Sequence, residues 1–319
     1  MNTQFLKKYQ PLFYKDFIID KEYIELLDTL NKMDSLNILL VGNSGSGKTS
    51  ILYATIREYY KMKEIPSKNV LLINNLKEQG ISYYRSEVKT FCQTPSIVPN
   101  KKKFIILDDI DFINEQSQQV FRNCIDKYSH KVHFLASCSN TQKVIESIQS
   151  RCTIIKLKPI SQSYLKIILN NIKTAEHLKI NEKAEKFILN ICNNSVRLLI
   201  NYLEKFKLLN IPIDEKKVKE ICTNISFYEF ENYTRAWYIN KDLQTSIKLI
   251  YSIYNKGYSV MDILDTYFLF IKSTNILSEE KKYKIIKLLC KYIIIFYNVH
   301  EDEIELALFT NNLINILCV

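Results

Sequence analysis

The residues best suited to chemistry form a glycine-rich run at positions 42–49. The run consists of Gly42, Asn43, Ser44, Gly45, Ser46, Gly47, Lys48 and Thr49, and it holds three of the five glycines in the 319-residue chain. Without a Cβ atom, glycine lets successive backbone N–H groups curl around phosphate oxygens. Lys48 adds a positive charge, and Thr49 can place its hydroxyl on Mg²⁺. The run therefore predicts a P-loop for the phosphates of ATP.

Acidic residues follow an apolar run farther along the chain. Residues 104–107 are Phe, Ile, Ile and Leu, and Asp108, Asp109 and Asp111 come directly after them. If the run is a strand of a parallel sheet, its carboxyl end lies at the same edge as the phosphate loop. We predict that Asp108 holds Mg²⁺, directly or through water, and that Asp109 orients or deprotonates the attacking water. Alone, such a cluster would more often cap a helix, but the upstream loop favours the metal role.

These side chains need a scaffold of strands and helices. Short apolar runs at 37–41, 70–73, 104–107, 133–136 and 153–157 alternate with segments of helical spacing such as 49–61 and 117–128. Continuous apolar runs are typical of strands covered on both faces, so we predict an α/β fold with a parallel sheet sandwiched by helices. After residue 159 only helical spacing recurs. This change, from alternating strands and helices to helices alone, predicts a nucleotide-binding domain at 1–160, a helical lid domain at 161–227 and a helical C-terminal domain at 228–319.

Composition narrows the class of protein. Lys and Arg number 44 against 34 Asp and Glu, and the net charge of +10 fits a nucleic-acid partner, although solvated lysines would produce the same excess. The eight cysteines form no Cys-x-x-Cys pair and no ligand spacing with the four histidines, so we predict reduced thiols and no transition metal. Lys287 and Lys291 interrupt the longest apolar stretch, 285–299, and no signal peptide is evident. We expect an intracellular protein that spans no membrane.

Along nearly the whole ATPase region, the chain resembles the small subunits of replication factor C, the clamp loaders of the AAA+ ATPase family. The most specific match is the family's Ser-Arg-Cys signature at residues 150–152. Lys8-Tyr9-Gln10-Pro11 resembles the family's Lys-Tyr-Arg-Pro, and Gln118-Gln119 with Arg122 resembles its Gln-Gln-x-Leu-Arg helix. Gly80-Ile81, followed by Arg85 and Lys89, resembles the family's Arg-Gly-Ile segment and the helix after it. Gly257-Tyr258-Ser259 resembles a turn in the family's C-terminal collar. The resemblance implies an AAA+ fold whose 228–319 domain is an oligomerising collar.

The resemblance also implies roles for two arginines. Arg151 would reach across a subunit interface to the γ-phosphate of a neighbour and stabilise the transition state there. Arg197 would be the lid arginine that senses the nucleotide bound to its own chain. In this chain Asn194 and Ser195 replace the family's Gly-Asp, so an ordinary surface arginine stays an alternative for Arg197.

Two departures from the family pattern concern the nucleotide site. Asp109 stands where the family has glutamate, one methylene longer, so catalysis here is expected to be slower. The family's polar sensor on the next strand is an asparagine. Gapless counting places Ser139 at that position and Asn140 one residue later, and the sequence leaves open which of the two faces the phosphate.

The resemblance implies partners as well. These are the other subunits of a hetero-pentameric clamp loader, a sliding clamp, and primer–template DNA bound without sequence preference. Arg85, Lys89 and Arg122 are the predicted DNA contacts, with solvated helix residues as the alternative. The Lys, Asn, Ile and Tyr bias suits an AT-rich genome and leaves the nucleus and a viral or cytoplasmic replication site both open.

The sequence is consistent with three alternative functions. The first is an ATPase motor subunit that loads a clamp. The second is a structural subunit that binds ATP, hydrolyses little of it and donates Arg151 to a competent neighbour. The third is another AAA+ replication factor, such as an origin-recognition or helicase-loading ATPase, which would carry a C-terminal winged helix with a β-hairpin. Residues 228–319 show no hairpin pattern, so the third reading ranks last.

Overall fold

The computed structural model describes residues 4–73, 81–192, 194–209, 212–222, 225, 227–296 and 299–318. The chain divides into two compact units. Unit 1 comprises Met1–Ala175 and Asn194–Glu204, and unit 2 comprises Glu176–Asn193 and Lys205–Val319. The predicted lid segment, 161–227, is thus shared between the two units, and the division into three domains stays a prediction.

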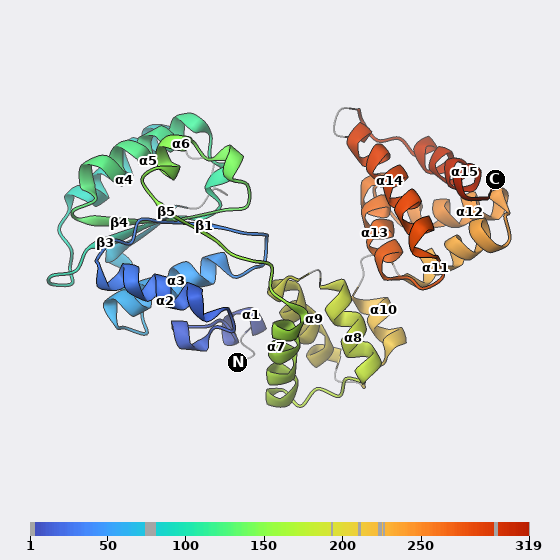
Figure 1. Ribbon diagram of the computed structural model, residues 1–319, viewed down its shortest axis with the longest axis horizontal. Helices are drawn as coiled ribbons and strands as arrows, with labels where there is room; N and C mark the ends of the chain where they lie inside the picture. The colour runs from blue at the N-terminus through green and yellow to red at the C-terminus, as the bar shows by residue number, and fades with distance from the viewer. Residues whose placement is uncertain are drawn as a thin grey trace. The chain divides into compact units, whose positions relative to one another are not determined.

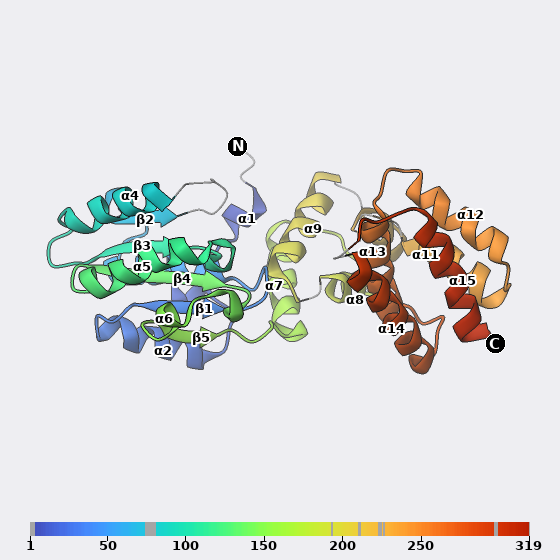
Figure 2. The same ribbon diagram turned by 90° about the horizontal axis from the view of Figure 1, so that it is seen from above.

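Unit 1 is built around a parallel sheet of five strands in the order β2-β3-β4-β1-β5, which Figure 2 shows in this sequence. The strands are β1 Ile38–Val41, β2 Val70–Ile73, β3 Lys103–Leu107, β4 Val132–Cys138 and β5 Thr153–Lys156. All five predicted strands are confirmed, and β4 extends beyond the predicted 133–136 at both ends. Because β1 pairs with both β4 and β5, the loop that follows β1 emerges near the middle of the sheet's carboxyl edge.

Helices cover both faces of this sheet (Figure 1). One face packs on α2 Lys21–Lys32 and α3 Lys48–Tyr60, and the other packs on α4 Ile81–Gln93, α5 Glu115–Tyr128 and α6 Glu146–Gln149. Successive strand residues point to opposite faces. Ile38 and Leu40 therefore join the first core and Leu39 joins the second. Burial on both faces explains the continuous apolar runs of β1, β3 and β4, whereas the edge strands β2 and β5 are partly exposed.

Unit 1 also contains α1 Phe5–Lys8, α7 Gln162–Ala175 and the part of α9 Val196–Leu209 that ends at Glu204. Short helical turns complete it, namely η1 Tyr14–Asp16, η2 Ser67–Asn69, η3 Ile110–Phe112 and η4 Thr141–Lys143. Of these elements, η3 follows Asp109 and contains Asp111, and α9 carries Arg197, so both matter for the site below.

Unit 2 is helical throughout its described residues, apart from an isolated bridge between Ile180 and Ile213. Besides the end of α9, its helices are α8 Glu182–Ile191, α10 Glu215–Ile221, α11 Phe227–Thr234, the π-helix η5 Arg235–Ile239, α12 Leu243–Tyr254, α13 Val260–Ser273, α14 Glu279–Phe296 and α15 Ile304–Cys318. Aromatic side chains fill its core, where the indole N–H of Trp237 donates to the Tyr267 hydroxyl at 3.2 Å. Among the described residues, no helix is both long and apolar enough to cross a membrane.

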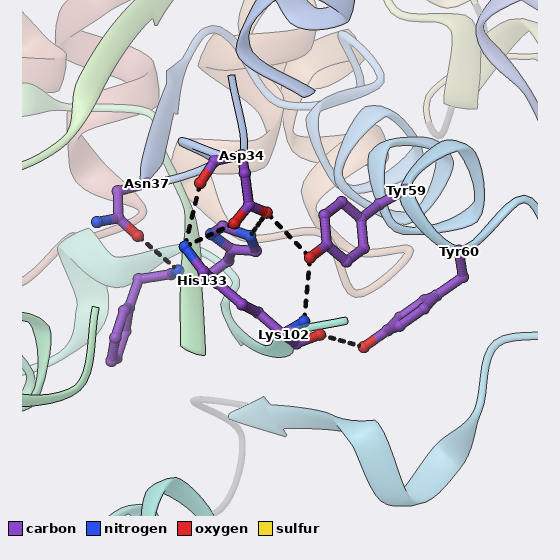
Figure 3. Close-up of polar contacts among 7 residues, drawn as sticks. Asp34, Asn37, Tyr59, Tyr60, Lys102 and His133 are labelled. Carbon is purple, nitrogen blue, oxygen red and sulfur yellow. Dashed lines mark hydrogen bonds and ion pairs between the residues drawn. The ribbon is translucent and has the colours of Figure 1, made fainter. Parts of the chain in front are cut away.

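A polar cluster around the buried side chain of His133 joins the loop after α2 to β4 and to the segment before β3 (Figure 3). The Asp34 carboxylate contacts His133 Nε2 at 3.1 Å, Lys102 Nζ at 2.9 Å and the Tyr59 hydroxyl at 3.0 Å. The Tyr59 hydroxyl in turn accepts a hydrogen bond from the Lys102 backbone N–H. Burial, reinforced by the positive charge of Lys102, lowers the pKa of His133 to about 4. The imidazole is therefore neutral in the folded protein at physiological pH.

This depressed pKa makes the folded state sensitive to acid. The unfolded chain takes up the His133 proton near its ordinary pKa of about 6.5, and the folded chain does so only near 4. Acidification from about pH 7 to about pH 5 should thus lower the free energy of unfolding by about 2 kcal/mol through His133 alone. Urea unfolding of wild type and of His133→Gln at both pH values measures the contribution of His133 to this loss of stability. Glutamine is a suitable replacement because it can still donate to Asp34 without titrating. An equal loss in both proteins would contradict the prediction.

Candidate nucleotide-binding site

The phosphate loop connects β1 to α3 and adopts a backbone that glycine favours. Gly45 and Gly47 have φ angles of +76° and +92°, in the left-handed region. A Cβ atom on Gly45 would lie 2.1 Å from Ser195 Oγ and 3.1 Å from Ser195 Cβ, so a larger residue would force the side chain that precedes α9 to move. The Ser46 hydroxyl is buried and has no hydrogen-bond partner among the described residues. An orphaned hydroxyl beside left-handed glycines fits a loop that binds phosphate.

Lys48 is the first residue of α3, and its side chain is buried against the loop. Its ammonium group donates to the carbonyl oxygens of Gly42 at 2.8 Å and Asn43 at 3.1 Å. The positive charge therefore sits inside the loop and next to the helix N-terminus, where the aligned peptide dipoles add further positive potential. Phosphate oxygens can replace or share these carbonyl contacts.

Thr49 and Asp108, the two residues predicted to hold Mg²⁺, contact each other. The Thr49 hydroxyl lies 2.9 Å from one Asp108 carboxylate oxygen and 3.1 Å from the other. Ser137, buried near the end of β4, donates to Asp108 Oδ1 at 2.6 Å. Residues from β1–α3, β3 and β4 therefore converge on one carboxylate. The oxygen-rich set fits a hard cation such as Mg²⁺, which prefers oxygen ligands.

Asp109 follows β3 with a φ of +50° and a ψ of +55°, a left-handed conformation that aspartate tolerates better than most residues. Its backbone N–H donates to Ser137 Oγ at 2.9 Å, which helps to fix this turn. Burial raises the pKa of the Asp109 carboxyl, and the negative charge of Asp108 raises it further. A carboxylate with a raised pKa is a stronger base, which suits a residue that takes a proton from water.

A pocket of about 580 Å³ contains the loop and both aspartates. Among its lining residues are the loop and the polar side chains near it, namely Ser44, Gly45, Ser46, Gly47, Lys48, Thr49, Asp108, Asp109 and Arg197. Apolar and aromatic residues also line it, namely Tyr9, Pro11, Phe17, Ile18, Ile19, Ile160, Ile168, Ile172, Val196 and Ile200. The volume lies within the range of about 300–1,000 Å³ typical of ligand pockets. A lining that combines a phosphate loop with apolar side chains has the dual character that a nucleotide requires, and all of these residues belong to unit 1.

Comparison with known families agrees with this geometry. Residues 38–160 match the family described as "ATPase family associated with various cellular activities (AAA)", and residues 234–292 match the "Replication factor C C-terminal domain". The chain therefore contains an AAA ATPase domain at residues 38–160 and a replication factor C C-terminal domain at residues 234–292. Unit 1 thus holds the matched ATPase region, and the second match falls within unit 2.

Individual relatives carry replication factor C names. The chain is 28% identical over 272 residues to replication factor C subunit 5 of Mus musculus, covering 85% of this chain and 80% of that protein. It is 27% identical over 282 residues to the replication factor C small subunit of Methanococcus maripaludis, covering 88% and 89%. These similarities extend over most of both chains.

Solved structures show a similar fold. The Thermotoga maritima RuvB Holliday junction branch migration motor superposes with a TM-score of 0.57 at 15% identity, covering 89% of this chain and 99% of that one. A Thermotoga maritima protein related to the DNA polymerase III gamma subunit gives a TM-score of 0.55 at 16% identity, covering 91% and 98%. At these identities the likeness concerns the fold alone.

The two sensor candidates of the AAA domain, Ser139 and Asn140, lie outside the pocket lining. The Ser139 hydroxyl and the backbone N–H groups of Ser139 and Asn140 all donate to Asp111 Oδ2, at 2.5 to 3.1 Å. The Asn140 side chain accepts from the Gln142 N–H and so caps η4. Burial would raise the pKa of Asp111, but these hydrogen bonds lower it overall. A sensor role for Ser139 or Asn140 stays a prediction.

Ser137 is the polar residue on β4 that the sequence analysis missed. It contacts Asp108 through its hydroxyl and Asp109 through that residue's N–H. The signal available in the sequence was a serine directly after the predicted strand 133–136, two residues before the position found by gapless counting. In this structure Ser137 is the β4 side chain that meets the acidic motif.

The remaining predicted residues lie away from the pocket lining. Arg151 ends up beside α5, where its Nε donates to Asp126, and its Nη1 donates to the Ser147 carbonyl oxygen at 2.7 Å. Arg122 also reaches Asp126, at 3.4 Å. Arg85 and Lys89 are exposed on α4, and Gly80 lies outside the described residues.

Proposed function

We propose that this chain is a small subunit of a clamp loader, in which ATP binding and hydrolysis drive the loading of a sliding clamp onto primer–template DNA. The observation that carries the proposal is an assembled phosphate pocket in the same chain as a replication factor C C-terminal domain. Fold-level likeness alone would not support it, because AAA+ proteins serve many functions on one scaffold.

In the proposed reaction the pocket binds ATP with Mg²⁺, held by Thr49 and Asp108. When bound, Mg²⁺ neutralises charge on the β- and γ-phosphates. Lys48 and the loop N–H groups orient the phosphates, and Asp109 orients the water and accepts its proton as the water attacks. Arg197, which lines the pocket, senses the nucleotide from its own chain. The products are ADP and inorganic phosphate.

The proposed partners follow from residues that the pocket does not use. Arg151 would serve the site of a neighbouring subunit in a hetero-pentamer, consistent with its position outside the lining of its own pocket. Arg85, Lys89 and Arg122 would contact DNA phosphates without reading bases. We expect the complex to act inside the cell, in the nucleus or at a viral or cytoplasmic replication site.

A structural subunit is the second candidate, and Asp109 is the observation that favours it. The shorter side chain withdraws the carboxylate by about 1.5 Å, one C–C bond, from where the family's glutamate would place it. Such a subunit would bind ATP, hydrolyse little of it and donate Arg151. The third candidate, an origin-recognition or helicase-loading ATPase, requires a β-hairpin in the winged helix. The described residues of 228–319 form helices and turns without a strand.

Substitutions at Asp109 separate the motor from the structural subunit. Misplacement of a catalytic group by about 1 Å can slow a reaction about a hundredfold, so Asp109→Glu should accelerate hydrolysis by up to that factor. Asp109→Asn should abolish turnover at this site and trap the clamp on DNA. Single-turnover hydrolysis in the assembled complex, with the other active sites silenced by substitution, measures both effects. Equal rates with Asp, Glu and Asn would reject the catalytic assignment and leave an ATP-binding scaffold.

A further inference from the structure

Each carboxylate oxygen of Asp126, on α5, interacts with the side chain of a different arginine. Its Oδ1 accepts a hydrogen bond from Arg151 Nε, and its Oδ2 lies 3.4 Å from Arg122 Nε. Arg122 lies one helical turn earlier on the same helix, whereas Arg151 follows α6. The hydrogen bond with Arg151 lowers the pKa of Asp126 below its usual range, so the carboxylate is ionised at neutral pH. Asp126 therefore ties the segment that carries Arg151 to α5.

The guanidinium of Arg151 is held along one side only. Nε donates to Asp126, and Nη1 donates to the Ser147 carbonyl oxygen at 2.7 Å and to Ser150 Oγ at 3.3 Å. Among the described residues, Nη2 has no hydrogen-bond or ion-pair partner. The plane of the group is thus fixed by a carboxylate and a carbonyl, while two N–H donors on Nη2 stay available to an incoming anion. The planar guanidinium can serve both at once because its five donors form a fixed fork.

We propose that Asp126 is a positioning residue, which orients Arg151 so that its Nη2 edge meets the γ-phosphate of ATP bound by a neighbouring subunit. This inference rests on the proposed function, in which Arg151 acts in trans. A free arginine loses rotamer freedom when it binds a phosphate, and a side chain already held in place loses less. Arg122 Nε forms an ion pair, without a hydrogen bond, with the second oxygen of Asp126 and so attracts the carboxylate from within α5. Arg151 need not leave Asp126 to act, because the two interactions use different nitrogens.

Replacing the carboxylate tests the proposal. In the assembled complex, Asp126→Asn should slow single-turnover hydrolysis at the neighbouring site about ten- to a hundredfold, since a mispositioned group is costly on that scale. ATP affinity at both sites should not change, and Asp126→Glu should restore part of the rate. The assay omits DNA, so that a DNA contact of Arg122 does not contribute. Asp28→Asn is the matched control, because Asp28 is a half-exposed carboxylate paired with Lys32 at 3.5 Å on α2.

A double substitution distinguishes positioning from general destabilisation. In an Arg151→Ala background, Asp126→Asn should have no further effect on the neighbouring site, because the group it orients is gone. An equal slowing in both backgrounds, an unchanged rate, or a faster rate from Asp126→Asn would each overturn the proposal. If Arg151→Ala itself left the neighbouring site unaffected, the trans role in the proposed function would fall together with this inference. A normal response to Arg151→Ala with none to Asp126→Asn would remove this inference alone.

Discussion

Complexes that carry Arg151→Ala should hydrolyse ATP at the neighbouring site about a thousandfold more slowly than wild type. The reason is that an arginine supplied in trans stabilises the charge of the phosphoryl-transfer transition state. In P-loop nucleoside triphosphatases this raises the rate of hydrolysis by about 10³- to 10⁵-fold. Arg151 is suited to this role, since it does not line the pocket of its own chain and carries donors on Nη2. Single-turnover hydrolysis, with all other sites silenced, measures the loss.

Two controls accompany the Arg151 experiment. The variant's own pocket should keep its ATP affinity, because Arg151 takes no part in it. Arg235→Ala removes another arginine held by a carboxylate, Glu231 at 2.9 Å, and should leave the rate at the neighbouring site unchanged once assembly is verified. Weaker ATP binding by isolated Arg151→Ala chains would show that the arginine acts in cis and would refute the trans assignment.

Lys48→Ala should weaken the binding of Mg²⁺-ATP by this chain at least about a hundredfold. The ammonium lies inside the loop, and losing charge-assisted contacts worth about 3 kcal/mol corresponds to that factor. Lys48→Met, which keeps the apolar stem, should behave in the same way if the charge is what matters. Equilibrium titration with a fluorescent ATP analogue gives the affinity of each variant.

Lys63→Ala is the control for general loss of positive charge, because Lys63 is exposed beyond the end of α3. It should bind ATP like wild type, and circular dichroism should show that all variants fold. Wild-type affinity in Lys48→Ala would reject the assignment of residues 42–49 as the phosphate loop. Loss of affinity in Lys48→Ala but not in Lys48→Met would show that the packing of the stem, not its charge, is required.

Local sequence determined the sheet and the centre of the site. The strands β1, β3 and β4 are largely buried on both faces, so their apolar runs are visible without any partner. Glycines at left-handed positions mark the loop between β1 and α3. The contact between Thr49 and Asp108 followed as well, because parallel strands that end at one edge must bring their carboxyl ends together. These predictions depend on chain connectivity and on the period of apolar residues.

Tertiary structure alone decided which polar side chains meet. Asp111 accepts hydrogen bonds from the loop of Ser139 and Asn140, and Ser137 donates to Asp108. Both contacts form because the pairing of β3 with β4 sets the register between segments that are distant in the sequence. Asp126 and Arg151, 25 positions apart, meet through the packing of α5 and α6. Hydrogen bonds need partners within about 3 Å, a precision that residue spacing does not provide for segments joined by long connections. Sequence thus specified the elements and the chemistry they carry, while packing selected the contacts.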